Sequence, residues 1–365
     1  MKKRLLATLL AGVLALSTLG LMACANDAPE APAEEAAEEA AEEAPAEEAA
    51  EEAPAEEAPA EAAEDWVIAV MPKLIGIPYF NASEVGALQA GEDFGVTVLY
   101  VGPTAADATE QVRMLEDLIV QGVDAIAVAP NDPDALAPVL QSARDAGILV
   151  LDWDTPANPE DVVKSIHQVD LDEFARLYFD LMVEEVGSEE FDFAIITGGL
   201  NAANLNGWID AGLAYAAERY PGLNLVTDRI PTDESQQLAY ERTLELLTAH
   251  PDVQAILGYS TPVPLGVAMA LRERGLIGEI VNIGSTTPND SVEFLEDGSL
   301  TMGLLWDPAM LGYLTVWAAI ELLEGREIYD GQYVPNVGNI TVDGQIVVMG
   351  PPSIWTNDNV RDFDF

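Results

Sequence analysis

The stretch 66–81, WVIAVMPKLIGIPYFN, brings together side chains that could hold a polar ligand. It begins with Val67–Met71, a continuous apolar run that predicts a strand covered on both faces in a parallel sheet. Lys73, Tyr79 and Phe80 follow, in a segment predicted to be the loop before the next helix. Because ligands of open α/β sheets bind outside the carboxyl ends of the strands, these side chains are candidates for the wall of a binding crevice.

The triplet Asp152-Trp153-Asp154 comes after another apolar run, 148–151, and is predicted to lie at the carboxyl end of a second strand. A single carboxylate in this position would be an ordinary helix cap. Two acids on either side of a tryptophan, level with Lys73, predict instead a polar grip on a ligand with a ring for stacking.

Polar, amide-rich loops follow the predicted strands in the second half of the chain. One loop contains Asn201, Asn204 and Asn206, and another contains Tyr259 and Thr261. A glycine pair precedes the first loop, but the sequence has neither a GxGxxG nor a GxxxxGK[ST] motif. A phosphate-binding loop is therefore not predicted.

Strand and helix patterns alternate between these loops, which is typical of a doubly wound α/β fold. The predicted strands are 67–71, 96–101, 125–129, 148–151, 191–197, 224–229, 253–257 and 279–283. The predicted helices are 83–94, 108–121, 134–146, 171–186, 204–220, 235–249 and 264–274. Asp132, directly before Pro133, is predicted to cap the third of these helices.

The composition limits the possible partners. The chain has 365 residues, 49% of them hydrophobic, which suffices for one large or two medium α/β domains. Its formal charge is -49, and residues 66–365 alone carry 47 acidic against 12 basic side chains. Nucleic acid is not expected as a partner, because neutralising phosphates requires basic patches. The negative field also disfavours anionic ligands and would suit a saline habitat, where salt screens self-repulsion.

The first 65 residues have the pattern of an exported, tethered protein. Residues 1–23 combine a basic start with an apolar stretch too short for a comfortable membrane span, as a signal peptide does. The ending Leu21-Met22-Ala23-Cys24 resembles the lipobox of bacterial lipoproteins, in which the cysteine becomes the lipidated first residue. Residues 25–65 are rich in Ala, Glu and Pro and hold 17 acids and no base, which predicts an extended, disordered tether. We therefore expect a lipid anchor at Cys24 on the extracytoplasmic face of a membrane, in the periplasm or on the cell surface.

An exported hydrolase is the competing class, and the sequence offers little for it. Cys24 is the only cysteine, so disulfides, a catalytic thiolate and Cys-ligated zinc are not expected in the mature fold. The two histidines, His167 and His250, are not spaced as a metal-binding pair, and no GxSxG motif is present. Asp152 and Asp154 could in principle act on a glycoside, but they are close in sequence and are expected to diverge. No catalytic residue, metal or cofactor is predicted.

Two doubly wound halves in one chain suggest a cleft between lobes, and several stretches carry a family resemblance. They are 68–80 (IAVMPKLIGIPYF), 100–104 (YVGPT), 123–129, 131–135, 151–154 (LDWD), 202–208 (AANLNGW), 284–288, 305–307 (LWD) and 355–365 (WTNDNVRDFDF). In their order and spacing they resemble the type I periplasmic solute-binding proteins of ABC importers, within the branch that includes autoinducer-2-binding and rhamnose-binding proteins.

The resemblance implies two Rossmann-like lobes joined by a three-segment hinge and closing on a ligand. The crossovers are expected near 167–170, 284–286 and 306–308. Lobe 1 would then consist of 66–168 and 285–306, and lobe 2 of 169–284 and 307–365.

The resemblance also implies a set of ligand contacts. The lysine and aspartate that hold the ligand in the autoinducer-2 branch fall on Lys73 and Asp152. The Asp-Gln pair of that branch is replaced here by Asn204-Leu205, and its proline and alanine contacts by Tyr259 and Thr261. The half of the pocket in the first lobe therefore carries over, and the half in the second lobe does not.

Amides, one cation, carboxylates and flat rings together suit a neutral sugar, whose hydroxyls donate and accept hydrogen bonds. We expect a rhamnose-like deoxyhexose or a pentose, bound by a monomer that works with an ABC permease. Autoinducer-2 binding, and presentation of a solute to a sensor, remain alternatives. The expected contacts are Lys73, Tyr79, Phe80, Asn131, Asp152, Trp153, Gln168, Asn201, Asn204, Asn206, Tyr259, Thr261 and Asp307.

Overall fold

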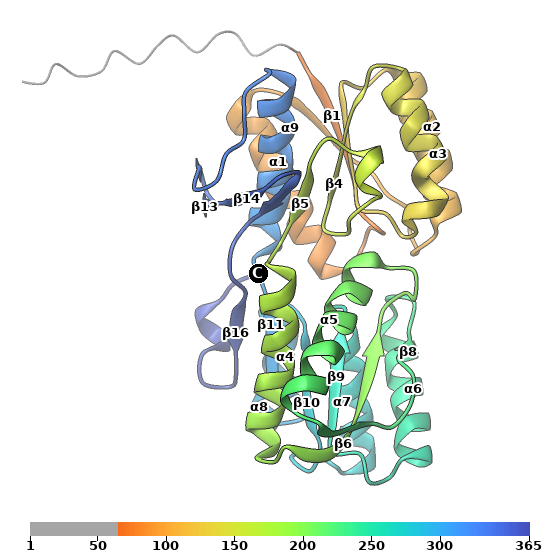
Figure 1. Ribbon diagram of the computed structural model, residues 1–365, viewed down its shortest axis with the longest axis vertical. Helices are drawn as coiled ribbons and strands as arrows, with labels where there is room; N and C mark the ends of the chain where they lie inside the picture. Colours follow the sequence, from red (N-terminus) through yellow and green to blue (C-terminus); the bar gives the residue numbers. More distant parts are fainter. Residues whose placement is uncertain (1–64) are drawn as a thin grey trace, which may run out of the picture. The chain divides into compact units, whose positions relative to one another are not determined.

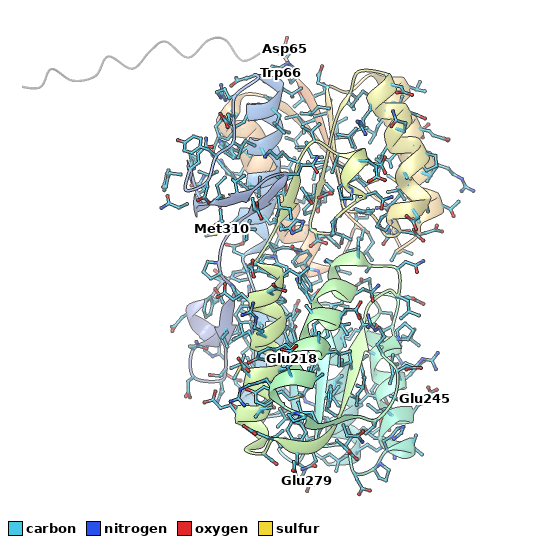
Figure 2. The ribbon with its side chains drawn as sticks, viewed as in Figure 1. Asp65, Trp66, Glu218, Glu245, Glu279 and Met310 are labelled. Atoms are coloured by element: carbon cyan, nitrogen blue, oxygen red, sulfur yellow. The ribbon has the colours of Figure 1, made fainter. Side chains whose placement is uncertain are left out.

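The computed structural model describes residues 65–365, beginning at Asp65 and Trp66 (Figure 2). The predicted signal peptide, the predicted lipidation site Cys24 and nearly all of the predicted tether lie outside these residues. Two large sheets carry the described fold, and helices cover both faces of each sheet. The predicted α/β class with two doubly wound lobes is confirmed.

Lobe 1 is built on a sheet whose neighbouring strands are all parallel except the pair β14 and β15. In spatial order the strands are β14 (Thr341–Asp343), β15 (Ile346–Val348), β5 (Ser165–His167), β4 (Leu149–Trp153), β3 (Ala125–Val128), β1 (Val67–Met71) and β2 (Thr97–Tyr100). Helices α1 (Pro78–Phe94) and α9 (Pro308–Leu323) cover one face, and α2 (Ala108–Gln121) and α3 (Pro133–Asp145) cover the other. The short elements η1 (Pro159–Asp161), β12 (Tyr333–Val334) and β13 (Gly338–Asn339) complete the lobe.

Lobe 2 is built on a second parallel sheet, to which the C-terminal strand β16 adds antiparallel. Its strands are β16 (Ser353–Trp355), β11 (Met302–Leu305), β10 (Val281–Ser285), β9 (Ala255–Tyr259), β6 (Glu190–Thr197) and β7 (Gly222–Leu225), with β8 (Ile230–Pro231) also paired to β6. Its helices are α4 (Leu171–Val186), α5 (Ala203–Arg219), α6 (Gln236–Ala249), α7 (Val263–Arg274), α8 (Pro288–Asp297) and η2 (Val360–Asp362). Helices α4 and α5 pack together on one face, and α6 and α7 on the other.

The apolar side chains of β1 pack in two separate hydrophobic cores. Ile68 and Val70 pack with α1 and α9, whereas Ala69 and Met71 pack with α2 and α3 on the opposite face. All four side chains are fully buried. Because successive side chains of a strand point to opposite faces, a strand between two helical layers must be apolar at every position.

Helices α1 and α9, far apart in the sequence, lie side by side in lobe 1 (Figure 1). They approach so closely that a side chain at Gly86 would collide with the backbone of Ala309, and one at Gly312 with the backbone of Ser83. This close contact ties the C-terminal part of the chain to the first helix.

The predicted division of the chain between lobes is wrong after residue 284. Residues 285–306 contain α8 and β11, and β11 pairs with β10 in the sheet of lobe 2. The segment 307–350 contains α9 and β15, and β15 pairs with β5 in the sheet of lobe 1. The chain therefore passes between the sheets near 168–170, near 306–307 and near 350–352, and not at 284–286. The expected division placed a crossover near 284–286, whereas β10 continues through α8 to β11 within lobe 2.

Most predicted elements are present, and two helices, α2 and α4, match residue for residue. Asp132 caps α3 as predicted, accepting a hydrogen bond from the backbone N–H of Ala135 at 3.1 Å. Three boundaries bear on the site. Helix α1 begins at Pro78, β4 extends to Trp153, and β9 extends to Tyr259.

Charge is concentrated on the outside of the described fold. Glu218, Glu245 and Glu279, for example, are exposed on lobe 2 (Figure 2). Within residues 65–365, no helix combines the length and the apolarity needed to cross a membrane.

Candidate ligand-binding site

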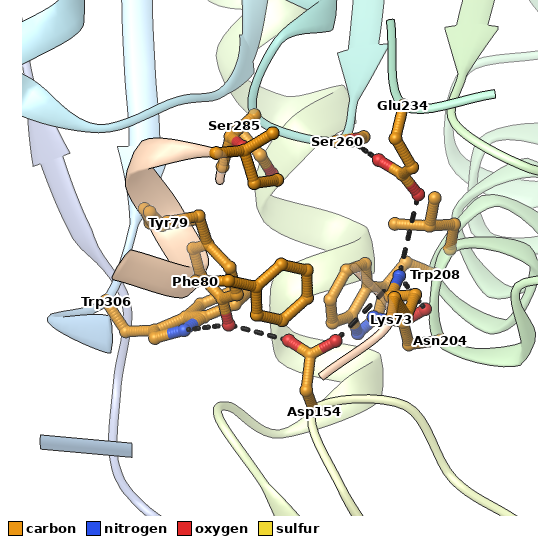
Figure 3. Close-up of a pocket in the computed structure, with 14 residues that line it drawn as sticks. Lys73, Tyr79, Phe80, Asp154, Asn204, Trp208, Glu234, Ser260, Ser285 and Trp306 are labelled. Atoms are coloured by element: carbon orange, nitrogen blue, oxygen red, sulfur yellow. Dashed lines mark hydrogen bonds and ion pairs between the residues drawn. The ribbon is translucent and has the colours of Figure 1, made fainter. Parts of the chain in front are cut away.

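A cavity of about 40 Å³ lies where the carboxyl ends of strands from both sheets meet (Figure 3). One part of its wall is polar and another is aromatic. The lining residues are Lys73, Ile77, Tyr79, Phe80, Asp154, Asn204, Leu205, Trp208, Glu234, Ser260, Thr261, Ser285, Leu305 and Trp306. The position agrees with the rule that α/β sheets bind ligands at their carboxyl edges.

Lys73 lies at the centre of the polar wall and is 5% exposed. Its Nζ is 3.5 Å from Asn204 Oδ1, 3.6 Å from Glu234 Oε1 and 3.8 Å from Asp154 Oδ2. A close charge-assisted hydrogen bond is about 2.7 to 2.9 Å long, so each of these contacts is loose. The ammonium group is surrounded by acceptors from both lobes and can still donate to a ligand oxygen.

Asp154 is the first residue after β4 and is held by a chain of hydrogen bonds. Trp306 Nε1 donates to the Tyr79 hydroxyl at 3.0 Å, and that hydroxyl donates to Asp154 Oδ1 at 2.6 Å. Gln168 Nε2 donates to the same oxygen at 2.9 Å. Burial first, and the charge of Asp154 second, raise the pKa of Tyr79 well above its usual range, so the phenol stays protonated. The carboxylate is therefore fixed with its other oxygen facing Lys73.

Glu234 is the second acid of the cavity and comes from lobe 2. It follows Asp233, and both residues have positive φ, 59° and 49°. Ser260, which has φ 98°, donates a hydrogen bond from its hydroxyl to Glu234 Oε2. Gly198 lies directly against the carboxylate, so that a side chain there would collide with it.

Backbone strain is concentrated at this site. Within residues 65–365, five non-glycine residues have positive φ, and three of them, Asp154, Glu234 and Ser260, line the cavity. Such conformations cost of order 1 to 3 kcal/mol each and persist where the surrounding structure imposes them. Their position among polar side chains makes this cavity the candidate functional site.

The aromatic wall is formed by residues from both lobes. Trp306 lies 5.7 Å from Trp208 and 6.1 Å from Tyr79 between ring centroids, and Tyr79 makes an edge contact with Phe80 at 4.9 Å. Tyr79, Phe80 and Trp306 lie on the side of the cavity away from Lys73, whereas Trp208 lies beside Lys73 (Figure 3). A ligand with polar groups on one side and C–H groups on the other matches this arrangement.

Five of the predicted contacts line the cavity: Lys73, Tyr79, Phe80, Asn204 and Thr261. Tyr79 and Phe80 do so from the first turn of α1, and not from a loop.

Asp152 and Trp153, which were predicted to face the ligand, do not line this cavity. Both belong to β4, which continues two residues beyond its predicted end. Asp152 accepts hydrogen bonds from the Ser165 hydroxyl and from the backbone N–H of Ala157, and neither it nor Trp153 lines the cavity. Burial raises the pKa of Asp152 to about 7. Trp153 is fully buried and donates from Nε1 to the carbonyl of Met71 at 3.2 Å.

Six other predicted contacts also lie outside the cavity wall, and most are engaged elsewhere. Gln168 supports Asp154, and Tyr259 is fully buried and stacks on Tyr178. Asp307 caps α9. Asn131 donates to the carbonyl of Lys73 at 2.8 Å. The last two are Asn201, which donates to Asp132 Oδ2 at 2.9 Å, and Asn206, which is bonded to Leu200 and Arg229.

Six acids, indole rings and serines of the cavity wall are absent from the expected contacts: Asp154, Trp208, Glu234, Ser260, Ser285 and Trp306. Of these, Asp154 belongs to the Asp152-Trp153-Asp154 triplet that the sequence predicted as a polar grip on a ligand. Asp154 and Trp306 had a signal, since each follows directly at the end of a buried strand. The sequence contains no such signal for Glu234, because the order Thr232-Asp233-Glu234 does not predict two successive residues with positive φ.

Half of the buried Lys, Arg, Asp and Glu side chains in the described part line the cavity. Among residues 65–365, the buried Lys, Arg, Asp and Glu side chains are Lys73, Asp152, Asp154, Asp161, Glu234 and Glu321, and three of them line it. No group of three or more acidic, histidine or cysteine side chains within this range is placed to hold a metal ion.

Two parallel α/β lobes that meet at a polar and aromatic cavity define the type I periplasmic-binding-protein fold. The family model described as the periplasmic binding protein domain matches residues 68–327. The chain belongs to this family, whose sugar-binding members are the solute-binding proteins of ABC transporters.

Known proteins agree with this assignment. The chain is 24% identical over 272 residues to the ribose import binding protein RbsB of Bacillus subtilis, covering 73% of this chain and 84% of that protein. A solute-binding protein from Clostridium phytofermentas with bound L-rhamnose is 28% identical, with a TM-score of 0.78, covering 82% of this chain and 98% of that one. LsrB from Clostridium saccharobutylicum in complex with AI-2 is 23% identical, with a TM-score of 0.77, covering 82% of this chain and all of that one.

Proposed function

We propose that this protein captures a small neutral sugar, a rhamnose-like deoxyhexose or a pentose, in the interlobe cavity for an ABC importer. The observation that carries the proposal is the division of the cavity wall. Lys73, Asp154, Glu234 and Asn204 offer donors and acceptors, while Trp208 and Trp306 offer apolar surface. A deoxyhexose has a hydroxylated ring and a methyl group, which need both kinds of wall.

The proposal requires that the lobes separate to admit the ligand. The cavity holds about 40 Å³, whereas sites for drug-sized ligands span roughly 300 to 1,000 Å³. Lys73 of lobe 1 contacts Glu234 and Asn204 of lobe 2, and Asn201 contacts Asp132 at the edge of the cleft. A ligand that binds the two lobes together more strongly than these contacts do would favour the closed form.

Autoinducer-2 is the second candidate ligand. The sequence argued against it because Asn204 replaces an acid of that branch, and because Tyr259 and Thr261 change the shape of the pocket. Glu234 supplies an acid from the same lobe, and Tyr259 does not reach the cavity, so both arguments weaken. The small cavity also suits a small ligand.

Calorimetry with L-rhamnose, a panel of pentoses and hexoses, and autoinducer-2 tests the proposal. Tight binding of L-rhamnose or a pentose is the expected result, and tight binding of autoinducer-2 alone would contradict it. A ligand present at ~100 times its dissociation constant should also add ~2.7 kcal/mol to the free energy of unfolding. Recovery of the bound sugar unchanged after long incubation is expected of a binding protein, and turnover would point to an enzyme.

The cellular setting is part of the proposal. Cys24 would carry the lipid anchor, and residues 25–65 would hold a monomeric binding domain away from the membrane beside its permease. Replacement by Cys24→Ala should release the protein from the membrane fraction and remove the acyl mass. Adjacent genes for an ATPase and a permease would support import, whereas an adjacent histidine kinase gene would support a sensory role.

A further inference from the structure

We infer that the cavity selects its ligand by charge, with Glu234 as the residue that sets the selection. Neutral sugars and amino sugars are admitted, whereas sugar acids and sugar phosphates are excluded. The inference rests on the proposed sugar-binding function and names the class of sugar.

The charge balance inside the cavity is the first observation. Lys73, Asp154 and Glu234 are the charged residues of its wall, which gives a formal charge of -1 when both acids are ionised. The side chains of all three are at most 6% exposed. An anionic ligand would add a second uncompensated negative charge in a place that water screens poorly, whereas an ammonium group would neutralise the site.

The position of Glu234 is the second observation. Lys73 is shared, because its Nζ is 3.6 Å from Glu234 and 3.8 Å from Asp154. One cation therefore cannot compensate both carboxylates fully. Removing the charge at 234 would leave one acid and one base, and the cavity would become neutral.

Glu234 cannot turn away from a ligand easily. Its carboxylate is held by the hydroxyl of Ser260 and rests against Gly198, and its backbone is fixed at φ 59°. An anionic ligand would meet this carboxylate in place, without the relaxation that an exposed side chain could provide. Because the carboxylate of Glu234 cannot move away, it disfavours the binding of anionic ligands.

The exclusion of anions by Glu234 is a local effect, distinct from that of the negative electrostatic field of the whole protein. Asp233 precedes Glu234 and carries the same charge, but Asp233 is exposed, whereas the side chain of Glu234 is 5% exposed. The Debye length falls to about 3 Å at 1 M salt, so the field of exposed acids is then screened while buried charges still interact. Asp233→Asn is therefore the matched control for Glu234→Gln.

The test measures dissociation constants by calorimetry for three ring families, at 0.1 M and at 1 M NaCl. D-glucose, D-galactose and D-mannose are compared with their uronic acids and 2-amino derivatives, together with L-rhamnose and L-arabinose. In the wild type we expect uronic acids to bind roughly 100-fold or more weakly than the best neutral sugar, at both salt concentrations. Glu234→Gln should reduce this ratio at least roughly tenfold, and Asp233→Asn should change it less than about twofold.

Several results would overturn the inference. One is that the wild type binds a uronic acid as tightly as its neutral parent sugar. Another is that Glu234→Gln and Asp233→Asn change the ratio of their dissociation constants equally. A third is that the wild type no longer prefers the neutral sugar at 1 M NaCl. The wild-type salt comparison decides alone if Glu234→Gln does not fold, as judged by its melting curve. Binding of amino sugars without any neutral sugar would contradict the proposed function and leave the charge selection standing. Absence of binding in all three classes would contradict both.

Discussion

The polar wall of the cavity has two halves that differ in how much of their backbone is strained. In lobe 1, Lys73 follows the end of β1 and Tyr79 lies in the first turn of α1, so regular elements place both side chains, and Asp154 alone has positive φ. In lobe 2, Glu234 and Ser260 both have positive φ in irregular segments. The first half therefore relies mainly on regular elements, whereas the second relies mainly on strained backbone. We therefore expect the lobe 1 half to supply general affinity and the lobe 2 half to supply discrimination.

Replacing Lys73 should produce the largest effect, because its ammonium group touches both halves. Lys73→Ala removes a charge-assisted donor and leaves Asp154 and Glu234 facing each other without a cation. Sugar binding measured by calorimetry should weaken roughly 100-fold. Lys164→Ala is the control, since Lys164 does not line the cavity and its side chain, which is half-buried, donates to the carbonyl of Gly344. Unchanged affinity in Lys73→Ala would show that the polar wall does not hold the ligand.

Substitution of the two acids that flank Trp153 should have different effects on sugar affinity. Asp154→Asn is expected to weaken sugar binding roughly 50-fold, because this carboxylate faces the cavity and Lys73. Asp152→Asn should change affinity less than about twofold, because its partners are Ser165 and Ala157. Titration of both variants with the same sugar measures the difference. A reversed result would restore Asp152 as the ligand contact.

Asp152 should instead affect stability in a pH-dependent way. Its folded-state pKa of about 7 lies above the unfolded value of about 4, so the folded state binds more protons between these pH values. The stability due to the protonated carboxyl is complete below about pH 4 and is lost as the pH rises through about 7. Relative to Asp152→Asn, the wild type should lose about 3 kcal/mol in free energy of unfolding between pH 5 and pH 8. Urea unfolding at the two pH values measures this difference.

A second titratable residue, His167, is linked to Asp152 through Ser165 and also affects the pH dependence of stability. His167, whose pKa is lowered chiefly by burial, bonds the Ser165 hydroxyl at 2.8 Å and changes stability with the opposite sign below about pH 6.5. His167 is present in both proteins, so the difference between them isolates Asp152. Parallel pH profiles of the wild type and Asp152→Asn would contradict the raised pKa.

A glycine substitution should disturb only the lobe 2 half and have the smallest effect. Gly198→Ala places a methyl group against the carboxylate of Glu234 and should displace it, weakening binding about tenfold and relaxing the charge selection. Gly199→Ala is the matched control, because a side chain at Gly199 would meet no atom within 4 Å. Calorimetry with one neutral sugar and its uronic acid compares the two variants. Equal effects would mean that the backbone, and not Glu234, was perturbed.

Much of the fold was predictable because periodicity and helix signals depend on local sequence. The capped helix α2 and the apolar strand β1 are examples, since Asp107 caps the helix and burial on both faces demands an apolar run. The lobe assignment after residue 284 was not predictable, because pairing of β15 with β5 is a long-range choice that no local pattern records. The wrong division followed from assuming a crossover where β10 simply continues to α8.

The site was predictable in part for the same reason. Lys73 and Asn204 come at a strand end and a helix start, which sequence patterns locate to within a few residues. Asp152 does not reach the cavity because β4 extends two residues beyond its apolar run, so the acid that lines the cavity is Asp154. Glu234 was not predicted as part of the site, because positive φ at a glutamate is imposed by the surrounding structure and has no signature in the local sequence.

The close pairing of α1 with α9 has a consequence for the order in which the chain can fold. Tyr79 and Trp306, which share a hydrogen bond, are 227 positions apart, and Asp93 and Tyr313 are 220 apart. Such distant contacts lose much chain entropy before they form, which slows folding. While the chain emerges from its N-terminus, the face of α1 that α9 will cover stays unprotected until lobe 2 has been almost entirely made. A chaperone or export factor that shields this face during synthesis would therefore act on lobe 1, the part of the fold that begins first and finishes late.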